Sequence, residues 1–168
     1  MDEATFDAFY QESFRRVVAQ IYAMCGNMAE AQDCVQEAFV RAWDKRKKLD
    51  TQQAPEAWVR TVAYRLAVSR WRKHSRAQRD PDRAVEVSAD REPNPDRVAL
   101  ERALNQLSPD QRRVIVLHHY CDLSVADIAD EVGAPAGTVK ARLARGRAAM
   151  KQFLTDTTLT DAPEVRHA

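Results

Sequence analysis

The clearest alternation of apolar and polar residues lies toward the end of the chain, between Leu123 and Lys151. Apolar positions recur there at three- and four-residue intervals in two successive stretches, which predicts two short amphipathic helices. Ser124 is a good N-cap for the first helix, Asp127 stands at its third position, and Gly133 favours a turn at its end. Pro135 then suits the start of the second helix, so the pattern predicts a helix-turn-helix.

The predicted second helix has two chemically different faces. Its expected buried face lies on a narrow arc: Val139, Leu143, Gly146 and Met150. The opposite face combines small side chains with cations: Gly137, Thr138, Lys140, Ala141, Arg142, Ala144, Arg145 and Ala148. The stretch Ala136–Gln152 holds five Lys or Arg residues and no acid. This layout is typical of a helix that enters a DNA major groove, although a solvated basic helix in a bundle has the same pattern.

Three amphipathic helices are expected in the first half of the chain, over Thr5–Cys25, about Met28–Asp44 and about Glu56–Ser75. Asn27 can cap the second of them. Between the second and third helices, Lys45–Pro55 begins as a basic run and continues as a polar loop. We therefore expect a small bundle with a basic loop before its third helix.

The third predicted helix also has two faces. Its apolar side is expected to pack on the first two helices: Trp58, Val59, Val62, Ala63 and Leu66. The other side is expected to hold Arg60, Tyr64, Ala67 and Trp71. Bases stack on aromatic rings and phosphates pair with cations, so two exposed aromatics among arginines suit unstacked or single-stranded nucleic acid. Packing of Tyr64 or Trp71 against a further helix is equally compatible with the pattern.

Residues 78–96 contain three prolines, many charges and few large apolar side chains. Such a segment buries too little surface to offset its ordering entropy, so we expect a flexible acidic linker. A short helix is predicted over Arg97–Gln106, and Ser108, Pro109 and Gln111 form a strong start for the next. The sequence thus predicts an all-α protein of two small helical bundles joined by this linker, the second containing the helix-turn-helix.

The 168 residues carry a formal net charge of only +1, but the charges are segregated. Residues 41–79 carry +9 and residues 136–152 carry +5, whereas residues 1–40 carry −5 and residues 80–101 carry −4. Two basic blocks between acidic segments indicate two separate contacts with a polyanion. A membrane surface would attract the same cations, but we find no lipidation signal, amphipathic anchor, signal peptide or apolar run near the roughly 18 residues that span a bilayer.

Catalytic and metal-binding patterns are not evident. Cys25, Cys34 and Cys121 lack the close spacing of a zinc site, and we expect them to be reduced, buried thiols of a cytoplasmic protein. His118 and His119 are adjacent on a helix, where neighbouring side chains diverge. No Gly-rich phosphate loop or nucleophile elbow occurs. We expect no enzymatic activity, cofactor or metal.

Three motifs together resemble those of the extracytoplasmic-function sigma factors of bacterial RNA polymerase, and the likeness runs from about Phe6 to Lys151. Ala29–Trp43 is similar to the family's helix that docks on the clamp helices of the polymerase. Pro55–Lys73 is similar to its promoter −10 helix. Leu123–Arg147 is similar to its −35 helix-turn-helix, with GTVKARL as the most specific part.

The resemblance implies a cytoplasmic transcription initiation factor. It would bind core RNA polymerase and direct it to promoter DNA by reading duplex −35 and melted −10 elements. The implied division is sigma region 2 over residues 1–76, a linker over 77–96, sigma region 4 over 97–152 and a short tail over 153–168. An anti-sigma factor that buries the same surfaces is the expected regulator, and no membrane contact is expected.

Carried over residue by residue, the resemblance implies three sets of contacts. Polymerase-binding residues are Asp33, Gln36, Glu37 and Arg41. Residues expected at the −10 element are Lys47, Lys48, Arg60, Tyr64, Arg65, Arg70, Arg72 and Lys73. Residues expected at the −35 element are Thr138, Lys140 and Arg142 on the backbone and Ala141, Ala144 and Arg145 at base edges. The loop 47–54 is expected to hold a flipped −10 base, and among the base-edge residues only Arg145 can pair bidentately with guanine.

Some positions depart from the family pattern. Arg65 and Ser69 stand where Asn and Asp are common, so a −10 sequence preference does not transfer, and Ala141 replaces a frequent serine. Two alternatives remain. A sigma-like adaptor would bind polymerase or an anti-sigma factor without initiating transcription. An autonomous helix-turn-helix regulator would need an α/β receiver or a ligand pocket within residues 1–76, and the pattern shows neither.

Overall fold

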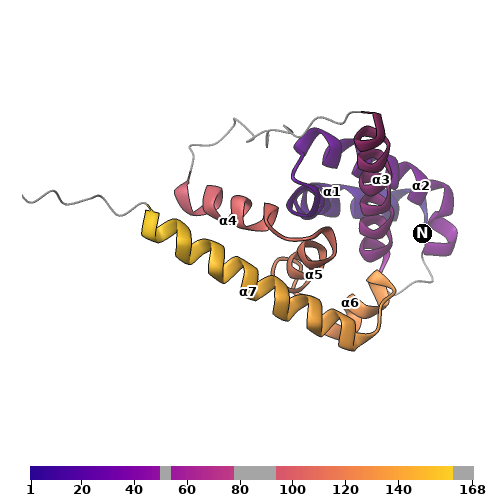
Figure 1. Cartoon of the computed structure of the whole chain (residues 1–168). Coiled ribbons are helices and arrows are strands. Elements are labelled where there is room, and N and C mark those ends of the chain that lie inside the picture. Colours follow the sequence, from indigo (N-terminus) through magenta and orange to yellow (C-terminus); the bar gives the residue numbers. More distant parts are fainter. Residues whose placement is uncertain (50–53, 78–93, 161–168) are drawn as a thin grey trace, which may run out of the picture.

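The computed structural model describes residues 1–49, 54–77 and 94–160, and within them every regular element is an α-helix (Figure 1). Three helices form the N-terminal half: α1 (Glu3–Cys25), α2 (Met28–Leu49) and α3 (Pro55–Ala77). Four form the C-terminal half: α4 (Pro95–Asn105), α5 (Pro109–His119), α6 (Val125–Val132) and α7 (Ala136–Thr160). The all-α prediction is confirmed, whereas most of the predicted linker, residues 78–93, lies outside the described residues.

Helix ends follow the local capping signals of the sequence. Asn27 Oδ1 accepts a 2.8 Å hydrogen bond from Glu30 N at the start of α2. Ser108 and Gln111 form a reciprocal capping box at the start of α5. The helix-turn-helix prediction is confirmed as well, because the Ser124 side chain caps α6 and Gly133 ends it in the left-handed conformation with φ 68°.

Two helices are longer than the sequence pattern predicts. The basic run before α3 was expected in a loop, but α2 continues through it to Leu49, which is only 1% exposed and anchors the last turn in the core. Three cations in that turn, Arg46, Lys47 and Lys48, favour the negative end of the helix dipole. The second extension is in α7, which runs to Thr160 through half of the predicted tail.

The N-terminal half is a three-helix bundle in which each helix packs on the other two. Its aromatic residues cluster between α1 and α2, where the Phe6 ring makes edge contacts with Phe39 and with Trp43 at centroid distances of 6.4 Å and 5.1 Å. The Trp43 indole also lies under the Arg46 guanidinium at 4.0 Å. These contacts fix the direction of α2 and therefore the side that it presents to solvent.

The C-terminal half is built around α7, which packs on α4, α5 and α6 (Figure 1). Three of the four residues of the expected buried face of α7 are buried, with Val139 at 0% and Leu143 at 3% exposure beside Gly146, whereas Met150 is half-buried. A Cβ atom added at Gly146 would lie 2.8 Å from Ile115 Cγ1, so only glycine allows α7 to approach α5 this closely.

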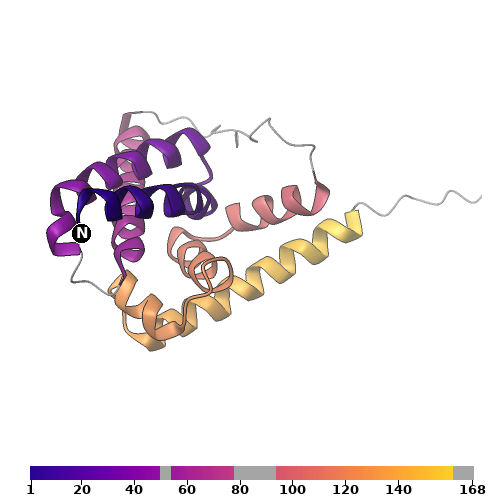
Figure 2. The ribbon, with the colours of Figure 1, turned by 180° about the vertical axis from the view of Figure 1, so that it is seen from behind.

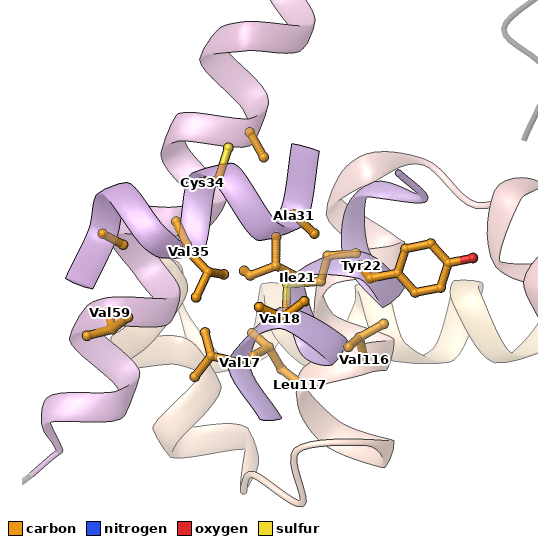
Figure 3. Packing of buried hydrophobic residues seen from close by; sticks show 14 of the residues in the cluster. Val17, Val18, Ile21, Tyr22, Ala31, Cys34, Val35, Val59, Val116 and Leu117 are labelled. Atoms are coloured by element: carbon orange, nitrogen blue, oxygen red, sulfur yellow. The ribbon is translucent and has the colours of Figure 1, made fainter. Parts of the chain in front are cut away.

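The two halves are not separate bodies. α1 packs on α5 and α3 packs on α6, and a single cluster of buried apolar residues runs through both halves. Figure 3 shows Val17 of α1 beside Leu117 of α5, and both are fully buried. Seen from behind in Figure 2, α5 and α6 lie between the N-terminal bundle and α7. Sequence periodicity predicts each bundle but not this contact between them.

Candidate nucleic-acid interface

The outward face of α7 is arranged as the sequence predicts. Five residues of that face are exposed: Gly137, Lys140, Ala144, Arg145 and Ala148. Three others are half-buried at its edge: Thr138, Ala141 and Arg142. The Arg142 guanidinium donates a 2.7 Å hydrogen bond to Asp110 Oδ2 of α5, which orients it. The helix therefore presents small side chains and cations on one accessible surface, as required for close approach to a polyanion.

The predicted face of α3 differs from the observed one. Arg60 and Ala67 were expected outside with Tyr64 and Trp71, but Arg60 is 5% exposed and Ala67 3%. Tyr64 is half-buried, and Trp71 alone of the four is open to solvent, at 51%. Arg60 is covered because Glu131 of α6 and Gln20 of α1 bond to it, and Tyr64 because Arg113 of α5 lies over its ring. Arg72 and Lys73, farther along α3, are exposed.

Arg60 joins α3 to the helix-turn-helix through a buried ion pair. Its Nε donates to Glu131 Oε1 at 2.9 Å and its Nη2 to Glu131 Oε2 at 2.6 Å, a bidentate pairing with α6. Its Nη1 donates to Gln20 Oε1 at 3.1 Å and lies 3.7 Å from Glu56 Oε1. Burial by itself would lower the pKa of Arg60, but the bonds to Glu131 outweigh it and raise that pKa.

A second cation from the C-terminal half covers Tyr64. The Arg113 guanidinium of α5 lies 4.2 Å from the centroid of the Tyr64 ring, within cation–π distance. Its Nε is buried and has no hydrogen-bond partner in the described part of the chain. Burial lowers the pKa of Arg113 and raises that of Tyr64. An arginine therefore lies against the ring that was expected to stack on a base.

Beside this contact is a cationic cavity of about 420 Å³ between α3 and α5. Its lining residues are Tyr64, Arg65, Val68, Ser69, Arg72, Lys73 and Arg113. Four members of the predicted −10 set, Tyr64, Arg65, Arg72 and Lys73, are thus brought together. Lys47 and Lys48 do not line it and are exposed in the last turn of α2, not in the loop where they were expected.

Arg70 turns away from that cavity toward α2. Its Nη2 donates to Glu37 Oε2 at 2.9 Å, and its Nη1 lies 3.9 Å from Asp33 Oδ2. Arg41 also pairs with Glu37, which lies one helical turn before Arg41 on α2. Three of the four predicted polymerase-binding residues, Asp33, Glu37 and Arg41, therefore form one charged network with a residue of the predicted −10 set.

The outer face of α2 contains an apolar residue that the motif comparison missed. Val40 is 60% exposed and stands on the same helical face as Gln36 and Glu37. Its position could have been read from the sequence, because it follows those two residues at four- and three-residue spacing. Asp33, Gln36 and Arg41 are exposed around it, so this surface combines charges with one apolar contact point.

An apolar groove of about 1090 Å³ lies between α1 and helices α4, α5 and α7. Leu100 and Tyr120, two of the exposed large apolar residues, line it. Its charged lining residues are mostly cations: Arg97, Glu101, Arg112, Arg147 and Lys151. The groove is therefore suited to an amphipathic segment with acidic flanks.

The three cysteines are free thiols, and Cys34 is fully buried. Burial raises the pKa of Cys34 and of Cys121 to about 11, so both thiols are protonated near neutral pH. Within the described residues no group of three or more His, Cys, Asp or Glu side chains could hold a metal ion. None of the helices described here is long and apolar enough to cross a membrane.

Comparisons with known proteins agree with the order of these surfaces along the chain. Residues 9–77 match the Sigma-70 region 2 family and residues 97–150 match Sigma-70 region 4. The ECF RNA polymerase sigma factor SigL of Mycobacterium tuberculosis is 31% identical over 166 residues, covering 95% of this chain and 94% of the relative. The factor SigW of Bacillus subtilis is 30% identical, covering 80% of this chain and 81% of the relative.

Solved structures show the same fold. The sigma factor RpoE of Bartonella quintana, in complex with the anti-sigma factor NepR, is similar with a TM-score of 0.77 and 27% identity, covering 90% of this chain and 97% of that one. CnrH, in complex with the cytosolic domain of CnrY, has a TM-score of 0.64 at 19% identity, with 96% of this chain and 92% of that chain covered. With both sigma regions present in order, the chain belongs to the extracytoplasmic-function sigma factors of bacterial RNA polymerase.

Proposed function

We propose that this protein binds core RNA polymerase and directs it to specific promoters, reading the −35 element as duplex and the −10 element as melted DNA. The observation that carries the proposal is the presence of both sigma regions in one chain, over residues 9–77 and 97–150. The outward cationic face of α7 supports it, since this surface fits a duplex. The protein supplies positioning, and the polymerase supplies the chemistry.

At the −35 element, α7 would enter the major groove through its exposed face. Arg145 is exposed and can donate two hydrogen bonds to a guanine, while Ala144 allows close approach at its side. Lys140 and Arg142 would contact phosphates, with Thr138 at the helix start. Ala141 would face a base edge without a polar contact of its own.

At the −10 element, the cavity beside α3 would hold the displaced strand. Arg65, Arg72 and Lys73 supply positive charge next to the Tyr64 ring, and Trp71 is exposed near the end of the helix. Aromatic stacking and phosphate pairing together hold single strands with little dependence on sequence. The stretch 47–54 was expected to hold a flipped base as a loop, but Lys47 and Lys48 lie in the last turn of α2, where they would extend the basic surface. Residues 50–53 of that stretch lie outside the described residues.

The polymerase would dock on the outer face of α2. Asp33, Gln36 and Arg41 are exposed there, Glu37 lies among them, and Val40 adds an apolar point at the centre. Polar residues around a single apolar contact are typical of protein interfaces that form and dissociate. Because Arg70 is bonded to Glu37, docking on α2 would also affect the charges on α3.

An anti-sigma factor is the expected regulator. Two similar sigma factors, RpoE and CnrH, were solved in complex with an anti-sigma factor or with the cytosolic domain of CnrY. The apolar groove between α1 and the C-terminal helices supports such a partner here, because Leu100 and Tyr120 are exposed in it. We expect the protein to act in the cytoplasm, where the polymerase works.

Transcription with purified core polymerase tests the proposal directly. Mixing this protein with core enzyme and a pool of genomic fragments should give transcripts with defined starts, and their upstream sequences would reveal both promoter elements. Binding to core without promoter-dependent transcripts would favour the adaptor alternative. Tight duplex binding in a gel-shift assay without any association with core would favour an autonomous regulator and contradict the proposal.

A further inference from the structure

The groove between α1 and helices α4, α5 and α7 combines an apolar lining with cations that lack a carboxylate partner. We propose that this groove binds a small amphipathic anion, a long-chain carboxylate of the fatty-acid class. Its volume of about 1090 Å³ is slightly above the usual range for small-molecule sites, which leaves room for a long chain. This binding would need neither polymerase nor DNA, so it goes beyond the proposed function.

The apolar lining comes from each of the helices around the groove. Leu100 of α4 is 47% exposed, and Tyr120, which follows α5, is 57% exposed. Met150 and Leu154 of α7 are half-buried in the same lining. Helices α4 and α7 lie side by side in both views (Figures 1 and 2), so these residues form an elongated apolar strip. A ligand with a chain that covers the strip gains affinity from the water it displaces.

The first cation at the groove, Arg112 of α5, is half-buried and has hydrogen bonds to neutral oxygens. Its Nε donates to Ala23 O and its Nη1 to Asn105 Oδ1, each at 2.6 Å. Burial lowers the pKa of Arg112, whereas the bonds to Glu131 raise the pKa of Arg60. Since a partly buried charge without a counter-ion is unfavourable, an anion beside Arg112 would be stabilising.

Two further cations line the groove from α7. Arg147 is exposed, and its Nε donates at 3.1 Å to His119 Nε2, the lone pair of a neutral imidazole. The Lys151 side chain, one helical turn farther along, has no hydrogen-bond or ionic partner among the described residues. Glu101 is the only acid among the described lining residues, and it is already paired with Arg97 at 3.0 Å. The groove therefore has an excess of positive charge beside its apolar surface.

This combination distinguishes between classes of ligand. A neutral lipid would leave the cations without a counter-ion, and a nucleotide or inorganic phosphate would leave the apolar strip open to water. A long-chain carboxylate matches both, because its chain covers the strip and its head accepts charge-assisted hydrogen bonds from the cations. Since the same groove supports the anti-sigma partner of the proposed function, a bound carboxylate would compete with that partner.

Isothermal titration calorimetry of the full-length protein with dodecanoate, kept below its micelle concentration, tests the proposal. Dodecyltrimethylammonium keeps the chain and reverses the charge of the head, and butanoate keeps the head and shortens the chain. We expect saturable binding of dodecanoate, at least about tenfold weaker binding of the cationic probe, and no detectable binding of butanoate. Decanoate should bind about tenfold more weakly than dodecanoate, because each buried methylene contributes about fourfold.

Equal binding of dodecanoate and dodecyltrimethylammonium would show attraction to any detergent and would overturn the proposal. Circular dichroism at saturation should show unchanged helix content. Loss of helix on addition of dodecanoate would mean that the probe unfolds the protein, and this result would also overturn the proposal.

Substitution of the two α7 cations locates the head of the ligand. Arg147→Gln combined with Lys151→Gln should weaken dodecanoate binding about tenfold, because two charge-assisted contacts are lost. The matched control, Lys140→Gln combined with Arg145→Gln, removes the same charge from the exposed outward face of the same helix. It should change the dissociation constant by less than about twofold, since screened surface charges contribute little at a distance.

A substitution at the apolar strip locates the chain. Leu100→Asp places a carboxylate on the strip and should weaken dodecanoate binding about tenfold or more. Val40→Asp is the control, because Val40 is also exposed, at 60%, but lies on α2 outside the groove. Equal effects of the groove variants and their controls would place the ligand elsewhere and contradict the proposal. Promoter-dependent transcription without dodecanoate binding would leave the proposed function intact and remove this inference alone.

Discussion

The two helices that carry the predicted DNA contacts, α3 and α7, differ in what covers them. The polar face of α7 is exposed, with Lys140, Ala144 and Arg145 open to solvent. The polar face of α3 is an internal contact at Arg60, which is 5% exposed and is held by Glu131 of α6, whereas Arg72 and Lys73 further along the helix are exposed. Cations on one helix face can therefore either stay open to a partner or pair with an acid of the same chain. Which of the two occurs depends on whether another helix places a carboxylate beside them.

The largest effect on stability is expected from a substitution in the core that packs between the two halves. Leu117 of α5 is fully buried and belongs to the core cluster that includes α1. Leu117→Ala should lower the free energy of unfolding by about 2–5 kcal/mol, because it removes contacts and leaves a cavity. Chemical denaturation would measure this change and show whether the halves unfold together.

Leu100→Ala provides the control, since Leu100 is 47% exposed and its loss should change stability by about 0.5 kcal/mol or less. If Leu117→Ala were equally mild, the shared core would not hold the halves together. The packing of the C-terminal half on α1 would then contribute little to the stability of the fold.

The placement of α7 depends on Gly146. A Cβ there would lie 2.8 Å from Ile115 Cγ1, and Ile115 is only 4% exposed and cannot easily move aside. Gly146→Ala should therefore lower the free energy of unfolding by about 1–3 kcal/mol through overpacking, despite the better helix propensity of alanine. Gly137→Ala is the matched control, since a Cβ there meets nothing within 4 Å and should not destabilise the fold.

The exposed face of α7 should carry sequence specificity at one base pair. Arg145→Ala is expected to weaken binding by about 1–3 kcal/mol on promoters with the favoured base and to relax discrimination at that position. Lys140→Ala should instead weaken all promoters similarly and reduce the salt dependence. Binding to a panel of −35 duplexes with single substitutions separates the two, and a uniform loss from Arg145→Ala would make Arg145 a phosphate contact.

The smallest expected effect concerns the acid sensitivity of the charged network around Glu56, in the first turn of α3. Burial alone would raise the pKa of Glu56, but hydrogen bonds from Arg16 outweigh it and lower that pKa below its ordinary value of 4.5. A lowered pKa in the folded state means that the stabilisation is complete above pH 4.5 and is lost as the pH falls through the lowered value.

Glu56→Gln should therefore remove part of the pH dependence of the melting temperature below about pH 4.5 and leave its slope at pH 6–8 unchanged. Thermal unfolding followed by circular dichroism at a series of pH values would show this. Identical profiles for the variant and the wild-type protein would mean that the Arg16–Glu56–Arg60 chain contributes nothing to stability.

Local signals of the sequence were sufficient for most of the fold. The caps at Asn27, Ser108 and Ser124 act over three residues, so they can be recognised without knowing the neighbours. The face of α3 could not be predicted this way. Arg60 pairs with a carboxylate 71 residues away in the sequence, and no periodicity within one helix indicates such a partner.

The end of α2 could not be predicted from local sequence either. Its basic run resembles a loop in composition, but Leu49 at the end is buried by contacts with the rest of the bundle, and the cations suit the helix C-terminus. Among the candidate site residues, those exposed on α7 were predictable from one helix. Arg113 and Glu131 were not, because their roles arise only from the packing of the two halves.

The most direct test follows the distance between the halves during transcription initiation. Dyes at exposed Gln11 of α1 and Asp130 of α6 would report that distance by energy transfer in the free protein, with core polymerase and on promoter DNA. We expect high transfer in the free protein and a large loss in the promoter complex that makes RNA. Transfer that stayed high in a complex making promoter-specific RNA would contradict the central claim that the outer face of α7 and the cavity beside α3 read two separate promoter elements.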